Sequence, residues 1–213
     1  MMKIEYTEDQ YDMLKEVVNV AMGQAGNDLA TILESFVDLS VPEIKIVAAE
    51  NIVDTVLKES VFGEKEPVIA FKQHFDNNAM LGGEAVVIFN DDTRQRFSNL
   101  LGFSEKMDAV QEIDFMLELT NLMAGACINS ISQQLFDQHM SFSPPALLSE
   151  KNDLRTMAFT TFKRRNLKWD YTLLSKITFN LKDKSFKSDL LLFMSEAAIR
   201  AIAGAVDRLI EAY

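Results

Sequence analysis

The chain has 213 residues, 48% of them apolar, and it carries a formal net charge of -11. This apolar share supports a sizeable core and excludes wholesale disorder. The negative charge argues against nucleic acid or anionic lipid as partners. No apolar run approaches the ~18 residues of a membrane span. A single cysteine, and an acidic N-terminal segment without the apolar stretch of a signal peptide, predict a cytoplasmic protein.

The first half of the chain is expected to open with a long helix. Thr7 begins a capping-box pattern that predicts a helix over residues 8–38, which ends before Pro42 because the residue before a proline disfavours helix. The apolar and turn patterns then predict strands at 43–49, 67–75 and 84–89 and shorter helices at 51–58 and 91–101.

The second half is expected to repeat this order in outline. A long helix is predicted over 109–139, strands at 156–162, 169–180 and 184–194, and a final helix at 196–211. Long helices combined with antiparallel hairpins predict an α+β fold, a two-layer sandwich in which helices lie on an antiparallel sheet.

The two halves also match residue by residue. When the sequence is shifted by 102 positions, Asp12, Glu16, Asn19, Gly23, Leu33 and Pro42 fall on Asp114, Glu118, Asn121, Gly125, Leu135 and Pro144 without a gap. Later elements, such as 85–89 and 190–194, match at an offset of 105. No flexible linker separates the halves, so the chain is interpreted as one pseudo-two-fold symmetric domain, 1–213, with internal repeats at about 1–104 and 105–213.

The matched polar residues form a stripe on each long helix. At ~100° per residue, the four positions of each stripe fall within about 60° of one another, opposite an apolar face. The first stripe contains Asp12, Glu16, Asn19 and Gly23, and the second contains Asp114, Glu118, Asn121 and Gly125.

A carboxylate stripe is most often only a solvated face, and acidic groups near a helix start are favoured by the helix dipole. Against that interpretation, Asp and Glu four residues apart repel each other, and Asn and Gly both weaken a helix interior. Both helices carry these destabilising residues at equivalent positions. The stripes are therefore interpreted as docking surfaces with a chemical role.

The residue types restrict that chemistry. The stripes contain no nucleophile beside a base, because neither His74 nor His139 falls in them, and two carboxylates without histidine make a weak metal site, so none is predicted. An amide and a carboxylate three residues apart can act on a phosphoryl group carried by a partner. The amide would orient an attacking water, and the carboxylate would pair with a cation of the partner.

The spacing Asp-x3-Glu-x2-Asn-x22-Pro resembles the signature of the CheC/CheX/FliY phosphatases, and it occurs twice in this chain. The resemblance implies a pseudo-symmetric α/β two-layer fold and hydrolysis of the aspartyl phosphate of a CheY-like response regulator in chemotaxis signalling. It implies that Asn19 and Asn121 position the attacking water. It also implies that Glu16 and Glu118 contact a lysine in the active site of the regulator.

The remaining stripe residues are expected to contact the partner: Asp12, Gly23, Asp114 and Gly125. The regulator supplies the Mg²⁺ in this family, so the resemblance implies no cofactor of the chain's own. Each motif glutamate is followed by residues other than the commoner Ile-Gly pair, namely Val17-Val18 and Leu119-Thr120.

Two complete motifs in one chain resemble the CheC branch of the family most. CheX-like proteins are shorter and usually dimeric, and FliY-like proteins carry an extra N-terminal peptide and a flagellar-switch domain that this chain is expected to lack. A monomer is therefore expected, with the receptor deamidase CheD as a second candidate partner. The alternatives are a non-catalytic binder of phosphorylated CheY, a regulator of CheD, or an acidic scaffold without a site.

Overall fold

The computed structural model describes residues 5–32, 37–40, 42–77, 81–90, 108–163, 169–181 and 187–212. The elements of the first half are α1 (Glu8–Ile32), β1 (Val37–Leu39), β2 (Glu43–Ala48), the 3-10 turn η1 (Ala49–Asn51), α2 (Ile52–Glu59), β3 (Pro67–Asp76) and β4 (Gly82–Asn90). Those of the second half are α4 (Ala109–Phe136), β5 (Ser141–Phe142), β6 (Ala146–Asp153), α5 (Leu154–Thr161), β7 (Tyr171–Leu181), β8 (Lys187–Met194) and α6 (Glu196–Ala212). The α+β class is confirmed, and none of the described helices is long and apolar enough to cross a membrane.

Both long helices begin with a capping box. The Thr7 N–H donates to Gln10 Oε1 at 2.9 Å, and the Gln10 N–H donates to Thr7 Oγ1 at 3.2 Å, as the sequence predicts. At the start of α4, Asp108 and Gln111 make the same reciprocal pair. These contacts satisfy backbone donors that have no partner within the helix, so they fix where each helix starts.

One eight-stranded antiparallel sheet joins the two halves, in the order β1-β7-β8-β4-β3-β5 with β2 also on β7 and β6 also on β3. Strands β1 and β2 of the first half thus pair with the second half, and β5 and β6 of the second half pair with the first. Exchanging the halves leaves this pairing diagram unchanged, as a two-fold relation requires. Val86 and Leu191, which are 105 positions apart, pair directly in the central β4–β8 ladder.

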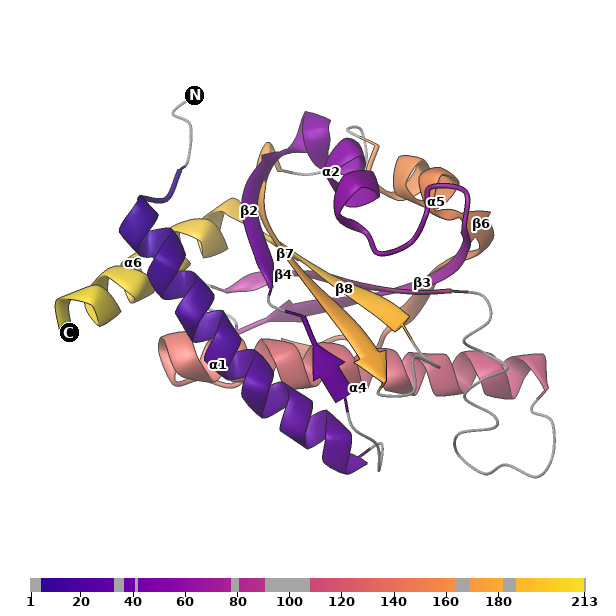
Figure 1. The fold of residues 1–213 in the computed structure, drawn as a ribbon, viewed down its shortest axis with the longest axis horizontal. Helices are drawn as coiled ribbons and strands as arrows, with labels where there is room; N and C mark the ends of the chain where they lie inside the picture. The colour runs from indigo at the N-terminus through magenta and orange to yellow at the C-terminus, as the bar shows by residue number, and fades with distance from the viewer. Residues whose placement is uncertain are drawn as a thin grey trace.

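Helices cover both faces of the sheet (Figure 1). The long helices α1 and α4 pack with α6 on one face, and the short helices α2 and α5 pack on the other. The second helical layer adds to the two layers that the sequence predicts. It is needed because the central strands are apolar on both faces, as in β4, where residues 85–89 are all buried.

The prediction of a strand at 156–162 is wrong. Residues 156–161 lie in α5, and the preceding strand β6 was not predicted. Its threonines and phenylalanines favour a strand locally. However, the Asp153 side chain accepts a hydrogen bond from the Thr156 N–H at 2.7 Å and caps a helix, and the buried Leu154, Met157 and Ala158 follow helical spacing.

The ends of the long helices also differ from the prediction. The first helix is described as far as Ile32 and not to 38, and Val37–Leu39 form β1 paired with β7. The second ends at Phe136 because Asp137 adopts a left-handed conformation with φ 53°. The other described elements are confirmed to within about three residues at their ends. The predicted helix at 91–101 lies outside the described residues.

Candidate functional site

The stripe of α1 lies on the surface of the protein. Asp12, Glu16, Asn19 and Gly23 are all exposed. The opposite face is buried against the sheet and the neighbouring helices through residues that include Leu14, Val18, Ala21, Ala25 and Leu29. The division into an apolar face and a polar stripe therefore follows the helical spacing of the sequence.

The stripe of α4 interrupts a helix that is otherwise mostly buried. Asp114, Glu118 and Asn121 are exposed and Gly125 is half-buried. The rest of the helix contributes a long row of core residues, including Met116, Leu119, Met123, Ala124, Cys127 and Ile128. The four stripe positions therefore form a narrow solvent-accessible strip on a helix that is otherwise mostly buried.

Both stripe glycines face open space. A Cβ atom placed on Gly23 or Gly125 would meet no atom within 4 Å, so nothing in the described structure requires glycine there. Each glycine lies one helical turn after the motif asparagine, on the same face. A bare backbone at this point lets the backbone or a bulky group of a partner approach closely.

The carboxylates of the stripes have few partners within the chain. Asp12 forms an exposed ion pair with Lys15 at 3.3 Å. Among the described residues, Glu16, Asp114 and Glu118 take part in no ion pair. Their charge is therefore available to a cation on another molecule.

The two motif amides differ in their surroundings. Asn121 Oδ1 accepts a hydrogen bond from Gln73 Nε2 at 2.6 Å, and the same nitrogen donates to the Ser143 backbone oxygen at 2.9 Å. Asn19 makes no side-chain hydrogen bond within the described part of the chain. Gln73 was not predicted as a site residue. Its one signal in the sequence is a polar residue within the alternating apolar positions of β3.

The segments that follow the long helices are anchored in the same way in both halves. Ser40 Oγ accepts from the Thr178 N–H at 2.9 Å, and Ser143 Oγ accepts from the His74 N–H at 3.1 Å. Ser40 lies two residues before Pro42 and Ser143 lies one residue before Pro144, so the end of each motif is fixed to a strand of the opposite half.

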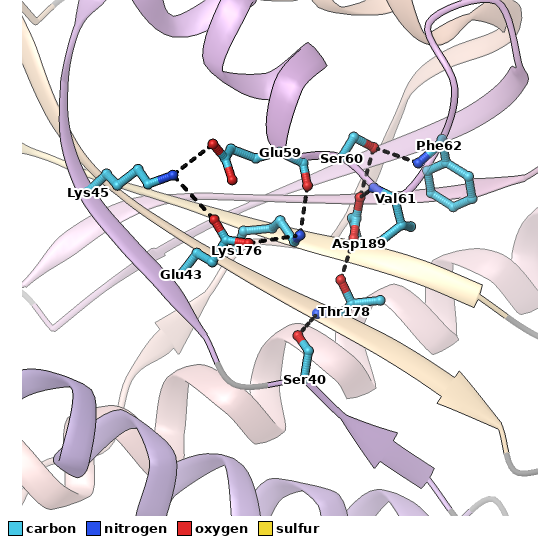
Figure 2. Close-up of polar contacts among 10 residues, drawn as sticks. All are labelled: Ser40, Glu43, Lys45, Glu59, Ser60, Val61, Phe62, Lys176, Thr178 and Asp189. Carbon is cyan, nitrogen blue, oxygen red and sulfur yellow. Dashed lines mark hydrogen bonds and ion pairs between the residues drawn. The ribbon is translucent and has the colours of Figure 1, made fainter.

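In the first half this anchor continues into a buried polar network (Figure 2). Thr178 Oγ1 donates to Asp189 Oδ1, and Ser60 Oγ and the Val61 N–H both donate to Asp189 Oδ2, each at 2.8 Å. The Asp189 carboxylate is fully buried, and these three donors compensate for its lost hydration. The network ties the end of α2 to β7 and β8.

Charged residues complete the network at the start of β2 (Figure 2). Lys176 Nζ donates to the Glu59 backbone oxygen at 2.7 Å, and Lys45 Nζ lies 2.7 Å from Glu59 Oε1. A hydrogen bond with the Glu43 carboxyl, followed by the bond with Lys45, lowers the pKa of Glu59 to about 2. Each charge in this network is matched by a partner within the chain, which indicates a structural role.

The other candidate residues lie outside the stripes. Cys127 is fully buried, as predicted, and burial raises the pKa of its thiol, so it is not a reactive group. His74 is exposed on β3 beside Asp76, with 3.4 Å between Nε2 and Oδ2, and His139 is also exposed. Within the described ranges, no three His, Cys, Asp or Glu side chains gather where they could hold a metal.

Comparisons with known proteins were informative only at the level of structure, because neither a protein-family model nor a curated protein matches the sequence. The chain is similar to the crystal structure of Thermotoga maritima FliY, with a TM-score of 0.67 and 16% identity over 96% of this chain and 99% of that one. It is similar to the FliM middle domain of H. pylori, with a TM-score of 0.59 and 9% identity over 94% and 99% of the two chains. It is similar to a CheC-like protein of Shewanella oneidensis, with a TM-score of 0.50 and 12% identity over 84% and 97%.

These identities are too low to carry over an activity, and they show the fold alone. At that level the resemblance stated from the motif is confirmed: the chain has the fold shared by the CheC, CheX, FliY and FliM structures.

Proposed function

We propose that this protein hydrolyses the aspartyl phosphate of a CheY-like response regulator in chemotaxis signalling, through the amides of Asn19 and Asn121. One observation carries the proposal. The same Asp, Glu, Asn and Gly positions recur on both long helices, all exposed except the half-buried Gly125, and among the described residues the space over both glycines is open.

In this reaction a water oxygen attacks phosphorus while the bond between phosphorus and the aspartate oxygen breaks. The regulator recovers its aspartate carboxylate, and the phosphate leaves with the protons of the water and exchanges them with solvent. Such a transfer needs positioning more than covalent help. The asparagine amide holds the water in line with the breaking bond, and Mg²⁺ held by the regulator would neutralise phosphoryl charge.

The carboxylates of the stripes fit the task of holding the partner. Glu16 and Glu118 are exposed and take part in no ion pair among the described residues, so each can contact a lysine of the regulator. Asp12 and Asp114 extend the negative surface by one turn, and the glycines leave room for the backbone of the regulator. CheD stays a second candidate partner, and a cytoplasmic monomer is the expected state.

The fold by itself does not select an activity, since proteins with several names share it and one fold can host different functions. The repeated amide supports hydrolysis over simple capture. Binding alone would not require an asparagine at the same point of two helices, whereas orienting a water does.

The test is the rate of phosphate loss from a CheY-like regulator phosphorylated with acetyl phosphate in the presence of Mg²⁺. We expect the native protein to accelerate this loss by about 10²–10⁴-fold. The Asn19→Ala/Asn121→Ala double variant should lose that acceleration. The matched control is Gln24→Ala/Gln134→Ala, which removes one exposed amide from each long helix outside the stripes and should retain it.

Binding of the phosphorylated regulator is measured in parallel by calorimetry. Binding without acceleration would overturn the proposal and support the non-catalytic binder. Acceleration that survives in the double variant would place the catalytic groups elsewhere.

A further inference from the structure

Gln73 is a polar exception on an apolar face. Residues 69, 71 and 75 of β3 point to the layer of long helices and are buried, apolar members of the core. Gln73 lies in the same row with 1% of its surface exposed. A buried amide at this position needs a reason, because each polar atom loses its hydration.

Its contacts fix how the amides face each other. The Ser143 backbone oxygen can only accept, so Gln73 must turn Nε2 toward it. The second hydrogen of that nitrogen meets Asn121, which must therefore present Oδ1 inward. The Asn121 Nδ2 makes no hydrogen bond with any described residue, and the side chain is exposed, so its two donors are left for an outside group.

The other half lacks this support. Gln73 pairs with Ala85 in the β3–β4 ladder, and Ile177 pairs with Leu190 in the β7–β8 ladder. Since Ala85 and Leu190 are equivalent in the repeat, Ile177 stands where Gln73 stands in the other half. The serine anchors agree, because they contact the next residue of each strand, His74 and Thr178. A buried isoleucine has no donor to offer to Asn19.

We propose that Gln73 is a positioning residue that holds the Asn121 amide in one orientation, so that the α4 stripe acts faster than the α1 stripe. The inference rests on the proposed hydrolytic function for its rate effect, but not for its structural content. A side chain already fixed loses less freedom when it orders the attacking water in the transition state, which is worth about two- to tenfold in kcat for one immobilised side chain.

A purely structural role for Gln73 is the competing explanation. The contact with the Ser143 oxygen would serve it, since this contact ties β3 to the segment before Pro144. However, that role does not require the second hydrogen bond, from Gln73 Nε2 to Asn121 Oδ1. A structural role also predicts that loss of Gln73 affects both stripes or neither.

The kinetic test compares Gln73→Leu in two backgrounds. In Asn19→Ala, where only the α4 stripe acts, the substitution should lower kcat about two- to tenfold with KM unchanged. In Asn121→Ala, where only the α1 stripe acts, it should leave both constants unchanged. Gln73→Met is a second variant of similar length and should behave alike. Equal losses in both backgrounds, or none in either, would overturn the inference.

A second test needs no phosphatase activity. In ¹⁵N-labelled native protein, relaxation of the side-chain amides should show Asn121 Nδ2 as rigid and Asn19 Nδ2 as mobile, and Gln73→Leu should make Asn121 as mobile as Asn19. Equal mobility of the two amides in the native protein would overturn the inference whatever the enzyme assay gives. The expected relaxation pattern without any dephosphorylation would overturn the proposed function and leave the positioning contact in place.

Discussion

Asn19 and Asn121 stand in the middle of long helices, each followed one turn later by a glycine. Both residue types lower helix stability, glycine by about 1 kcal/mol relative to alanine. No atom of the described residues requires either glycine, since none lies within 4 Å of a Cβ placed there. At the scale of single residues, the Asn and Gly of each stripe therefore lower the stability of the helix at a surface that an outside group can reach.

Replacing Gly125 by alanine should consequently stabilise the protein. The added methyl group meets no atom within 4 Å, and the helix gains about 0.5–1 kcal/mol in its free energy of unfolding. Urea denaturation followed by circular dichroism measures the change.

The matched control is Gly83→Ala. A Cβ at Gly83 would lie 2.2 Å from the Phe193 backbone oxygen, so this variant should lose about 3 kcal/mol. A loss of stability in Gly125→Ala would mean that Gly125 has a packing role within the chain.

At the scale of elements, the loop after α2 is held by a single buried carboxylate. Asp189 of β8 accepts hydrogen bonds from Ser60, Val61 and Thr178, and Thr178 in turn donates its N–H to Ser40. One side chain thus connects the short-helix layer, two central strands and the segment that leads from α1 into β2 (Figure 2).

Asp189→Ala should therefore be strongly destabilising. It leaves one buried and two partly buried donors without an acceptor, at about 1–3 kcal/mol for a buried donor and less for a partly buried one, so we expect the free energy of unfolding to fall by about 3 kcal/mol. Urea denaturation provides the measurement. Asp38→Ala, which removes an exposed carboxylate from β1, should change stability by less than about 0.5 kcal/mol. Similar effects of the two variants would contradict the role of the network.

At the scale of the whole molecule, the halves exchange strands. β1 and β2 complete the sheet on β7 of the second half, and β5 and β6 complete it on β3 of the first. Without the other half, each repeat would keep only its own antiparallel pair, β3–β4 or β7–β8, and would lose its remaining strand pairings. The two repeats are therefore expected to fold as one unit.

Equilibrium unfolding should accordingly show one transition. Trp169 is the single tryptophan and packs against the core under the short helices, to which both halves contribute, so its fluorescence reports that core, while circular dichroism reports all helices and strands. We expect the two probes to give the same midpoint in urea. Separate midpoints would show that parts of the chain unfold independently and would contradict the single domain 1–213.

Several features could be predicted because they depend on local geometry. Helical spacing places Asp12, Glu16 and Asn19 on one face wherever the helix lies, and the repeat can be found from the offset alone. Strand β6 and helix α5 were missed because the threonines and phenylalanines of 156–162 favour a strand locally, whereas the Asp153 cap and the buried spacing decide for a helix.

The sequence by itself determined the two stripes, the internal repeat and the α+β class, because these follow from spacings of a few residues along the chain. Only the tertiary structure decided which residues meet across the sheet. Gln73 and Asn121 are 48 positions apart and meet because β3 passes beneath α4, and Asp189 reaches Ser60 across 129 positions. Such contacts depend on how strands and helices are stacked, and no local pattern encodes that arrangement.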